Sequence, residues 1–544
     1  MTATSGDPSE SSRSEMSGRR VIPFHPWLLA LLTPLLILAQ NGLEIAPGQA
    51  VRSVVFELLF ASLVWLGCRL ATGEWRRSAL VASAFLLVFH AYGRFYAGSG
   101  HSAVQALPLV DRLAGNHALL LPLAMAVLAF LAFAVSRLHR FTTGMTNLLN
   151  IVSLTLCLVT AGTIALLEWR LAQAPGHAEF PIAQTVSGER APDIYYLVLD
   201  GYGRVDVLAD LYRFDNQPFL RQLESSGFTV ASGAHANYMQ TSLSLASSLN
   251  LEYLQSIVKA PATSDTGQAR LQIQRWLRHN RLAADLERRG YQLVAMESGY
   301  RPTQLAGAQL LGPSSAATNL LERLMIENSG LTLLQAFAGM PDSLRRPGYD
   351  LHRQRVDYAF AALQAGLPAS DRPRFVFVHI LVPHPPFVFN SVGQPTWPPY
   401  PYVLLDGDAY PADPADYPGL YRDQLTYVNQ RLTEALAGLL KNGGRRALIV
   451  VQGDHGPGSG LDWDSLARTD ARERFGILLA VRPPDGSSLD PGLIETPVNV
   501  FRWALAGLFG ADFPLLPDNS YYSTWLAPLA FQQVPSGQMS PPGQ

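Results

Sequence analysis

The sequence predicts a bundle of membrane-spanning helices followed by an α/β domain with a mostly parallel central sheet. Three observations support this fold class. Charged residues make up only 15% of the 544 residues, whereas ordinary soluble domains carry about 25%. Long apolar runs fill the chain up to about residue 170, and after residue 190 short apolar runs alternate with helical patterns. Long apolar runs are typical of membrane spans, and alternating strands and helices are typical of a sheet covered on both faces.

Five apolar runs in the first part of the chain are candidates for membrane spans. Each could cross the roughly 30 Å of hydrocarbon in a bilayer. The second run is the shortest and contains Glu57, so a buried or re-entrant helix is the alternative there. The first run has no clean small-residue cleavage site, which argues against a removable signal peptide. The runs lie at residues 23–40, 54–68, 79–95, 117–135 and 148–167.

Basic residues predict the orientation of these spans. They gather before the first run, between the second and third, and between the fourth and fifth. With five spans every basic cluster falls on one side, which the positive-inside rule assigns to the cytoplasm. The N-terminus is then inside the cell, and everything after the fifth span is outside. One span more or fewer would place the part after the last span inside instead. The clusters are Arg19, Arg20, Arg69, Arg76, Arg77, Arg137, His139 and Arg140.

Three polar residues interrupt the apolar runs: Glu57, His90 and Arg94. A charge inside a membrane span indicates a functional site by default. Our interpretation is that these side chains pair inside the bundle or lie near the interface, and a functional role stays the alternative.

Changes of composition predict the domain boundaries. A cytoplasmic N-terminus at 1–20 is followed by a transmembrane domain at 21–170 and a mixed, Pro- and Gly-containing linker at 171–190. The α/β domain then covers 191–528. The tail at 529–544 is rich in Pro, Gly, Ser and Gln, a composition typical of disorder.

The counts of charged residues and cysteines, together with the absence of nucleotide-binding motifs, exclude several classes of function. Lys and Arg number 41 against 43 Asp and Glu, a net charge of −2, so no basic footprint indicates a nucleic-acid partner. The two cysteines, Cys68 and Cys157, both lie in apolar runs, which argues against a disulfide framework or a thiolate zinc cluster. Neither a P-loop nor a dinucleotide-binding fingerprint is present.

Polar residues follow the predicted strands of the α/β domain. Asp200 directly follows the first strand, and Asp454 comes shortly after the third. In parallel sheets, binding and catalytic residues gather at the carboxyl ends of the strands. The strands are predicted at residues 194–199, 375–381, 448–451 and 476–481.

Four segments around these strands carry candidate functional residues. Asp200 followed by glycine suits a hard cation, although an Asp-Gly pair alone is more often a turn. Thr241 begins a Ser-rich helix, where a hydroxyl is commonly an N-cap but can also act as a nucleophile beside a bound anion. His379 and His384 flank a Pro-rich turn and can bind a metal, hold a phosphate oxygen or protonate a leaving group.

The fourth segment, VVQGDHGPG, ends a strand in Asp454 and His455 and continues as a Gly/Pro turn. Adjacent carboxylate and imidazole groups with flexible flanks can both reach one cation. Oxygen and imidazole ligands together fit zinc or manganese.

The order LVLDG, a Thr/Ser-rich helix start, HILVPHPPF and GDHG resembles the alkaline-phosphatase/sulfatase superfamily. The layout of spans and outer domain is similar to lipoteichoic acid synthases and lipid A phosphoethanolamine transferases. The resemblance implies an alkaline-phosphatase-like domain at 191–528 with Thr241 as the nucleophile. It also implies that His384, and with it His379, contacts the phosphate or the leaving group. The implied metal ligands are Asp200, Thr241, Asp454 and His455.

Departures from the family narrow the expected chemistry. The stretch TSLSL at Thr241 lacks the C/S-x-P-x-R motif of sulfatases, which argues against sulfate-ester hydrolysis. No histidine follows His455, so we expect one divalent ion (Mn, Zn or Mg) and no complete second metal site. Two cysteines cannot build the disulfide-rich outer domain of lipid A transferases, so lipid A is not implied as the substrate.

The resemblance therefore implies a transferase of the inner or plasma membrane, with its catalytic domain periplasmic or extracellular. It would move a phospho-head-group of the phosphoglycerol or phosphoethanolamine type from a phospholipid, through a threonine-linked intermediate, to a glycan or lipid acceptor of the envelope. The alternatives are a phosphodiesterase or phosphatase of the same fold, and a catalytically inactive envelope scaffold. The complete set of candidate residues argues against the scaffold.

Overall fold

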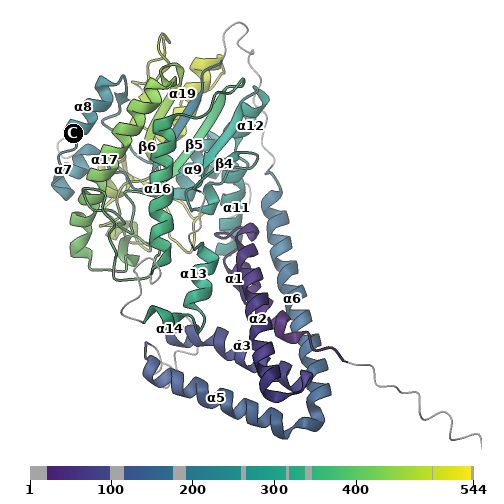
Figure 1. Ribbon diagram of the computed structural model, residues 1–544. Coiled ribbons are helices and arrows are strands. Elements are labelled where there is room, and N and C mark those ends of the chain that lie inside the picture. Colours follow the sequence, from purple (N-terminus) through teal and green to yellow (C-terminus); the bar gives the residue numbers. More distant parts are fainter. Residues whose placement is uncertain are drawn as a thin grey trace, which may run out of the picture. The chain divides into compact units, whose positions relative to one another are not determined.

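The computed structural model forms two compact units (Figure 1), which we call the helical unit and the sheet unit. The helical unit comprises Met1–Gly42, Pro47–Ala165 and Leu321–Ala338, and the sheet unit comprises Leu43–Ala46, Leu166–Leu320 and Gly339–Gln544. The structure describes residues 21–97, 115–175, 191–258, 265–313, 318–336, 346–492 and 494–540.

Five long helices coincide with the five predicted apolar runs. Four of them, among the described residues, are long and apolar enough to cross a membrane. The first helix has only 16 residues, which span about 24 Å and fall short of a typical hydrocarbon core. Crossing by this helix, and with it the odd number of spans, stays a prediction. The helices are α1 (His25–Gln40), α2 (Val51–Thr72), α3 (Trp75–Ala97), α5 (His117–Arg137) and α6 (Thr142–Ala172).

A later segment of the chain returns to the helical unit, so the predicted single boundary near residue 170 is wrong. This segment contains α13 (Leu320–Glu327) and α14 (Thr332–Gln335). The N–H of Gly330 donates to the Phe89 carbonyl at 2.8 Å. A Cβ on Gly93 would lie 2.2 Å from the Glu327 carbonyl oxygen, so only glycine permits this approach of two backbones.

Glu57 of α2 and His90 of α3 pair inside the helical unit. Their side chains are 2% and 9% exposed, and Glu57 Oε2 lies 3.2 Å from His90 Nε2. Two of the three polar residues of the apolar runs therefore lie next to each other inside the bundle.

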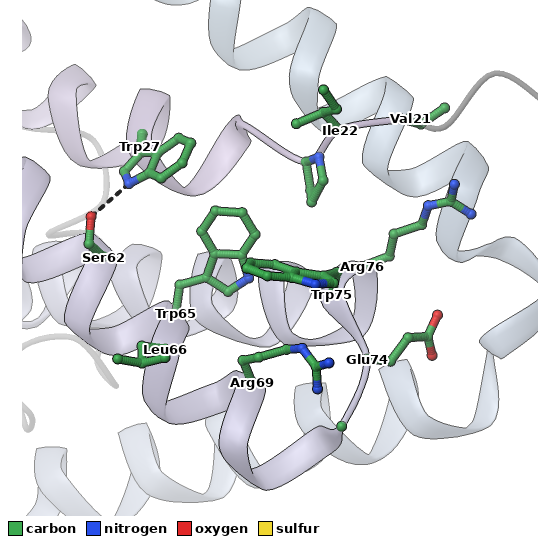
Figure 2. Close-up of a pocket in the computed structure, with 12 residues that line it drawn as sticks. Val21, Ile22, Trp27, Ser62, Trp65, Leu66, Arg69, Glu74, Trp75 and Arg76 are labelled. Carbon is green, nitrogen blue, oxygen red and sulfur yellow. Dashed lines mark hydrogen bonds between the residues drawn. The ribbon is translucent and has the colours of Figure 1, made fainter.

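Three tryptophans join the ends of α1, α2 and α3. The Trp65 ring meets Trp27 and Trp75 edge to face, with centroids 5.0 and 5.2 Å apart. The three rings line a pocket of about 840 Å³ together with Arg69, Glu74 and Arg76 (Figure 2). Edge-to-face aromatic pairs stabilise packing beyond the area they bury, so this cluster fixes the junction of the three helices.

The sheet unit is built on seven strands in the order β2-β7-β6-β1-β5-β3-β4. β1 pairs in parallel with β5 and β6, and β3 pairs in parallel with β5 and β4. β7 runs antiparallel to β6 and β2. The predicted mostly parallel sheet is thereby confirmed. The strands are β1 (Ile194–Leu199), β2 (Thr229–Val230), β3 (Gln292–Met296), β4 (Gln309–Leu311), β5 (Arg374–Ile380), β6 (Leu448–Gly453) and β7 (Leu479–Arg482).

Helices cover both faces of this sheet (Figure 1). Tyr196 and Val198 of β1 pack into one core with α9, α11, α12 and α19. Leu197 and Leu199 point to the other face and pack with α7, α8, α16 and α17. All six residues of β1 are buried, as expected of a central parallel strand. The helices are α7 (Val205–Tyr212), α8 (Gln217–Ser225), α9 (Thr241–Asn250), α10 (Leu254–Ile257), α11 (Thr266–Arg278), α12 (Arg281–Arg288), α16 (Pro347–Ala365), α17 (Tyr417–Lys441), α18 (Ala471–Phe475) and α19 (Pro497–Phe509).

The C-terminal residues are ordered up to residue 540, so the predicted disordered tail is wrong there. β8 (Ser520–Tyr522) pairs with β9 (Gln532–Val534). Arg204 also donates to the Met539 carbonyl at 2.8 Å. Val534 and Met539 are buried in the core. Their packing stabilises an ordered conformation in a stretch whose composition is typical of disorder. The predicted N-terminus at 1–20, most of the linker and the last four residues lie outside the described residues.

Leu197→Ala tests the central position of β1. Removing a fully buried leucine side chain should lower the free energy of unfolding by about 2–5 kcal/mol. The same substitution at Leu310 of β4, whose side chain is 47% exposed, should cost about 1 kcal/mol or less. Thermal unfolding of the full chain in detergent measures both, and equal shifts would contradict the assignment of β1 to the core.

Candidate active site

The site begins where two parallel strands end side by side. Leu199, the last residue of β1, lies opposite Gly453, the last residue of β6. This register places Asp200 next to Asp454, as predicted from the carboxyl ends of the strands. The N–H of Gly201 donates to Asp454 Oδ1 at 3.1 Å, which fixes the orientation of that carboxylate.

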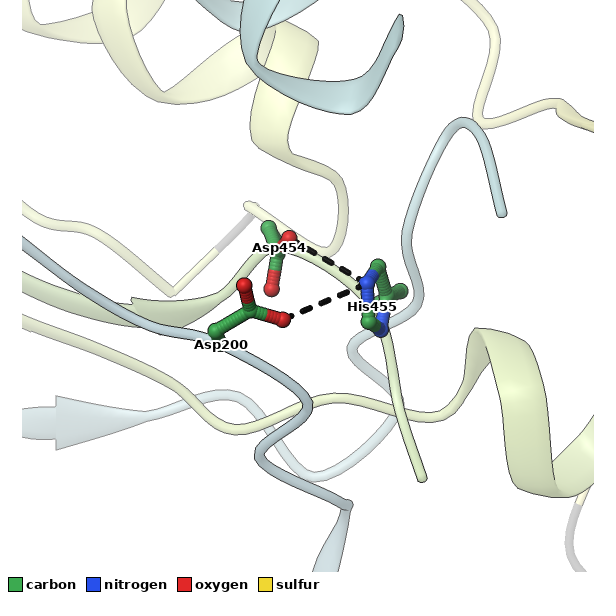
Figure 3. Close-up of side chains that lie close together, drawn as sticks. All are labelled: Asp200, Asp454 and His455. Atoms are coloured by element: carbon green, nitrogen blue, oxygen red, sulfur yellow. Dashed lines mark ion pairs between the residues drawn. The ribbon is translucent and has the colours of Figure 1, made fainter. Parts of the chain in front are cut away.

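Asp200, Asp454 and His455 form a compact group of possible metal ligands (Figure 3). The His455 Nε2 atom lies 3.4 Å from Asp200 Oδ1 and 3.4 Å from Asp454 Oδ2. Both carboxylate oxygens are buried and receive no hydrogen bond. A buried anionic oxygen without a donor is costly, so a cation at this point would satisfy both. The group therefore fits a divalent metal ion in donor type and position.

The imidazole of His455 is oriented so that its Nε2 atom can bind a metal ion. Its Nδ1–H donates to the Gly456 carbonyl at 2.9 Å, which directs the lone pair of Nε2 toward the two carboxylates. Burial lowers the pKa of His455, and the charge of Arg474 lowers it further. The ring is thereby kept neutral, which is the form that ligates a metal.

Thr241 is the first residue of α9 and brings a hydroxyl to the same group. Its Oγ1 lies 3.1 Å from His455 Nε2. The N-cap position belongs to Gln240, and no side chain caps the helix. The simple capping interpretation of Thr241 is therefore wrong. The hydroxyl lies against the metal-ligand group at a helix N-terminus, where the helix dipole favours an anion.

The two histidines of the Pro-rich segment occupy different places. His379 lies within β5 with Nε2 3.4 Å from Asp200 Oδ2, and it is not among the residues that line the pocket. His379 therefore lies directly beside Asp200, and its role in the reaction stays a prediction. His384 lines the pocket, and its Nδ1–H donates to the Pro385 carbonyl at 2.5 Å. Its Nε2 atom faces Asp406 Oδ2 at 3.7 Å.

Asp406 and Arg474 complete the pocket and were missed by sequence reasoning. Both are about 98% buried or more, and Arg474 pairs with Asp406 Oδ2 at 2.8 Å. Asp406 therefore links Arg474 to His384. No local signal could have found them, since Asp406 lies in a long irregular segment and Arg474 in a five-residue helix.

Charges hold the carboxylates of the site in their ionised form. Burial alone would raise the pKa of Asp200, but the charge of His384 and a hydrogen bond with His379 outweigh burial and keep it well below its usual range. Burial would likewise raise the pKa of Asp406, yet the charges of His384 and Arg474 lower it. Both side chains are therefore anionic at neutral pH.

Aromatic residues narrow the opening of the site. Tyr300, Trp463 and Trp525 line the pocket. The Tyr300 hydroxyl bonds to Ser242 Oγ at 2.6 Å, and burial raises the pKa of Tyr300 to about 12, so its phenol stays protonated beside Thr241. The free volume is about 70 Å³, roughly twice the share of one water molecule in the liquid. The pocket has room for a small tetrahedral group and not for a whole lipid.

The fold and the site together define a member of the alkaline-phosphatase superfamily. The match to the Sulfatase family covers residues 192–477, more than half of the chain, and the chain belongs to this family. It is an enzyme of this superfamily with a helical membrane part. No curated protein sequence shows significant similarity to the chain.

Several solved structures are similar to the chain at low sequence identity. The integral membrane protein lipooligosaccharide phosphoethanolamine transferase A of Neisseria meningitidis shares 11% identity over 90% of this chain and 95% of its own, with a TM-score of 0.40. The C-terminal periplasmic domain of EcEptC from Escherichia coli in complex with Zn shares 12% identity over 65% of this chain and 96% of its own, with a TM-score of 0.38. Phosphonate monoester hydrolase of Agrobacterium radiobacter shares 15% identity over 61% of this chain and 80% of its own, with a TM-score of 0.38.

Asp454→Asn tests the metal group directly. The amide removes one charged ligand oxygen but keeps the size of the side chain. We expect the bound metal of the purified protein to fall by about tenfold or more, measured by elemental mass spectrometry after dialysis. Asp371→Asn, at an exposed position of the sheet unit, is the matched control. Equal metal content in the two variants would contradict the assignment of Asp454 as a ligand.

Proposed function

We propose that the chain is a membrane-anchored, metal-dependent transferase of phospho-head-groups of the phosphoglycerol or phosphoethanolamine type. The donor is a phospholipid, and the acceptor is a glycan or lipid of the envelope. The proposal rests on one observation of the site. A hydroxyl at a helix N-terminus, Thr241 Oγ1, meets two buried carboxylate oxygens without donors and a neutral imidazole nitrogen.

In this proposal Asp200, Thr241, Asp454 and His455 hold one divalent cation, which is Mn, Zn or Mg. When bound, the cation lowers the pKa of the Thr241 hydroxyl and screens the charge of the phosphate. The residues supply two further effects. They hold the nucleophile and orient the phosphodiester.

In the first step Thr241 attacks the phosphorus atom of the donor after its hydroxyl proton passes to water. A bond forms between Oγ1 and phosphorus, and the bond from phosphorus to the lipid alcohol breaks. His384 protonates the departing alkoxide, which leaves as diacylglycerol. The head group is then joined to Thr241 as a phosphodiester.

In the second step a hydroxyl of the acceptor attacks the same phosphorus atom. Neutral His384 takes the proton of this hydroxyl, the bond to Thr241 Oγ1 breaks, and the threonine hydroxyl regains a proton from water. Asp406 Oδ2 faces His384 Nε2 at 3.7 Å, where it orients the imidazole. We infer that Asp406 is a positioning residue, which Arg474 holds in place at 2.8 Å.

The membrane helices support a lipid donor. Four helices among the described residues are able to cross a bilayer and thereby confine the enzyme to the surface that contains the donor. In this proposal the catalytic domain lies outside the cytoplasm, as the distribution of basic residues predicts.

Thr241→Ala tests the nucleophile. Purified protein is incubated with a bacterial lipid extract, quenched in acid, and the peptide that contains Thr241 is weighed. We expect an adduct whose mass identifies the head group, absent from Thr241→Ala, together with a loss of turnover of about 10³-fold or more.

Thr426→Ala, on an exposed turn of α17, is the control and should keep both adduct and turnover. Retained turnover in Thr241→Ala would contradict the nucleophile assignment. Release of head group to water with an acceptor present would instead favour a phosphodiesterase, and absence of any reaction with several divalent metals would favour a scaffold.

Asp406→Asn tests the positioning of His384. The metal content should stay unchanged, while transfer from a phospholipid falls by about 10–100-fold. Cleavage of a nitrophenyl phosphodiester should fall much less, because nitrophenolate leaves without a proton. Asp416→Asn, at an exposed position directly before α17, is the control. An equal loss on both substrates would contradict a role through the leaving group.

A further inference from the structure

The helical unit contains a second cavity, which combines an apolar wall with a polar end. Its volume is about 170 Å³, five or six times the roughly 30 Å³ share of a water molecule in the liquid. The apolar wall comes from α1 and α3. It consists of Leu29, Leu32, Leu36, Leu86 and Leu87, and Thr33 of α1 lies among them.

The polar end consists of His90, Arg94 and Asn328. The side chain of His90 is about 91% buried, and its Nδ1 atom has no hydrogen-bond partner among the described residues. Arg94 makes no hydrogen bond or ion pair in the part of the chain that the structure describes, and its side chain is exposed. Two residues that line the same small space thus have polar groups without a partner, the buried imidazole of His90 and the guanidinium of Arg94.

The position of Arg94 suits the phosphate of a lipid. It lies in the last turn of α3, three residues before the helix ends at Ala97, whereas Leu86 lies about 12 Å further along the axis. The ends of membrane-spanning helices lie near the polar head groups, and their middle lies among the acyl chains. The cavity therefore runs from the acyl-chain level to the phosphate level.

The returning segment closes this polar end. Asn328 follows α13, and its neighbours pack backbone to backbone on α3 at Gly93. Arg52 of α2 holds the start of the same segment through Glu322 at 2.8 Å. The position of Asn328 at the polar end is thus fixed by contacts within the helical unit.

We propose that this cavity binds one glycerophospholipid, with part of an acyl chain along the leucines and the phosphate at Arg94. We assign this cavity as a holding site for the donor, from which its phosphate passes to Thr241; this assignment rests on the proposed transfer reaction, whereas the binding itself does not. Charge complementarity favours a phospholipid over a neutral lipid, because a guanidinium donates paired hydrogen bonds to phosphate oxygens. Leu32→Trp would fill the apolar part, and Arg94→Gln would remove the cation.

Native mass spectrometry of the full chain in detergent tests the binding, with phosphatidylglycerol and diacylglycerol as probes. The unaltered protein should retain phosphatidylglycerol about tenfold more tightly than diacylglycerol. Arg94→Gln should abolish this preference, and Leu32→Trp should weaken retention of both lipids. The controls are Leu63→Trp, at a position of α2 that is 68% exposed, and Arg137→Gln, in the last turn of α5.

Kinetics distinguish the donor role from the chemistry. Both cavity variants should raise KM for the lipid donor about tenfold, with kcat unchanged, and should cleave a soluble nitrophenyl phosphodiester normally. Thr241→Ala should still bind phosphatidylglycerol while losing all cleavage. Equal retention in Leu32→Trp and Leu63→Trp, or in Arg94→Gln and Arg137→Gln, would overturn the site. Lost retention with an unchanged KM would overturn the assignment of the lipid as the donor.

Discussion

The register between β1 and β6 determines the position of the whole site. Because Leu199 lies opposite Gly453, the next residues of the two strands place two carboxylates side by side in a buried position. Two buried carboxylates repel each other and have lost their hydration by water. The arrangement is therefore stable only with a compensating cation or proton. His455 follows directly in the chain, and Thr241 approaches from the start of α9, so all four candidate ligands converge at one point.

The balance of charge around this point favours one divalent ion. Three buried carboxylates, Asp200, Asp406 and Asp454, lie around this point. Asp406 is neutralised by Arg474 at 2.8 Å, which leaves two carboxylates whose combined charge matches one divalent cation. Arg474 and His384 also line the pocket. The site thereby combines a dianionic metal position with basic side chains in its lining, an arrangement suited to an anionic substrate.

Much of this arrangement could be predicted from the sequence, because short apolar runs ending in polar residues mark buried parallel strands. Asp200, Asp454 and His455 were identified in this way, and the structure places them together. Asp406 and Arg474 could not be identified, since only the folded chain brings their irregular segments to the pocket. The return of α13 and α14 to the helical unit was missed for the same reason: it depends on contacts at Gly93 and Gly330. The prediction of a disordered C-terminal tail, which rested on composition, was wrong. There the pairing of β9 with β8 and the burial of Met539 stabilise a Pro- and Gly-rich stretch.

Anomalous X-ray diffraction from crystals of the full chain grown with Mn or Zn tests the central claim most directly. The account predicts a single anomalous peak within about 2.0–2.3 Å of atoms from Asp200, Thr241, Asp454 and His455. A peak at other residues, or two peaks about 3.5–4 Å apart as in two-metal sites, would contradict it.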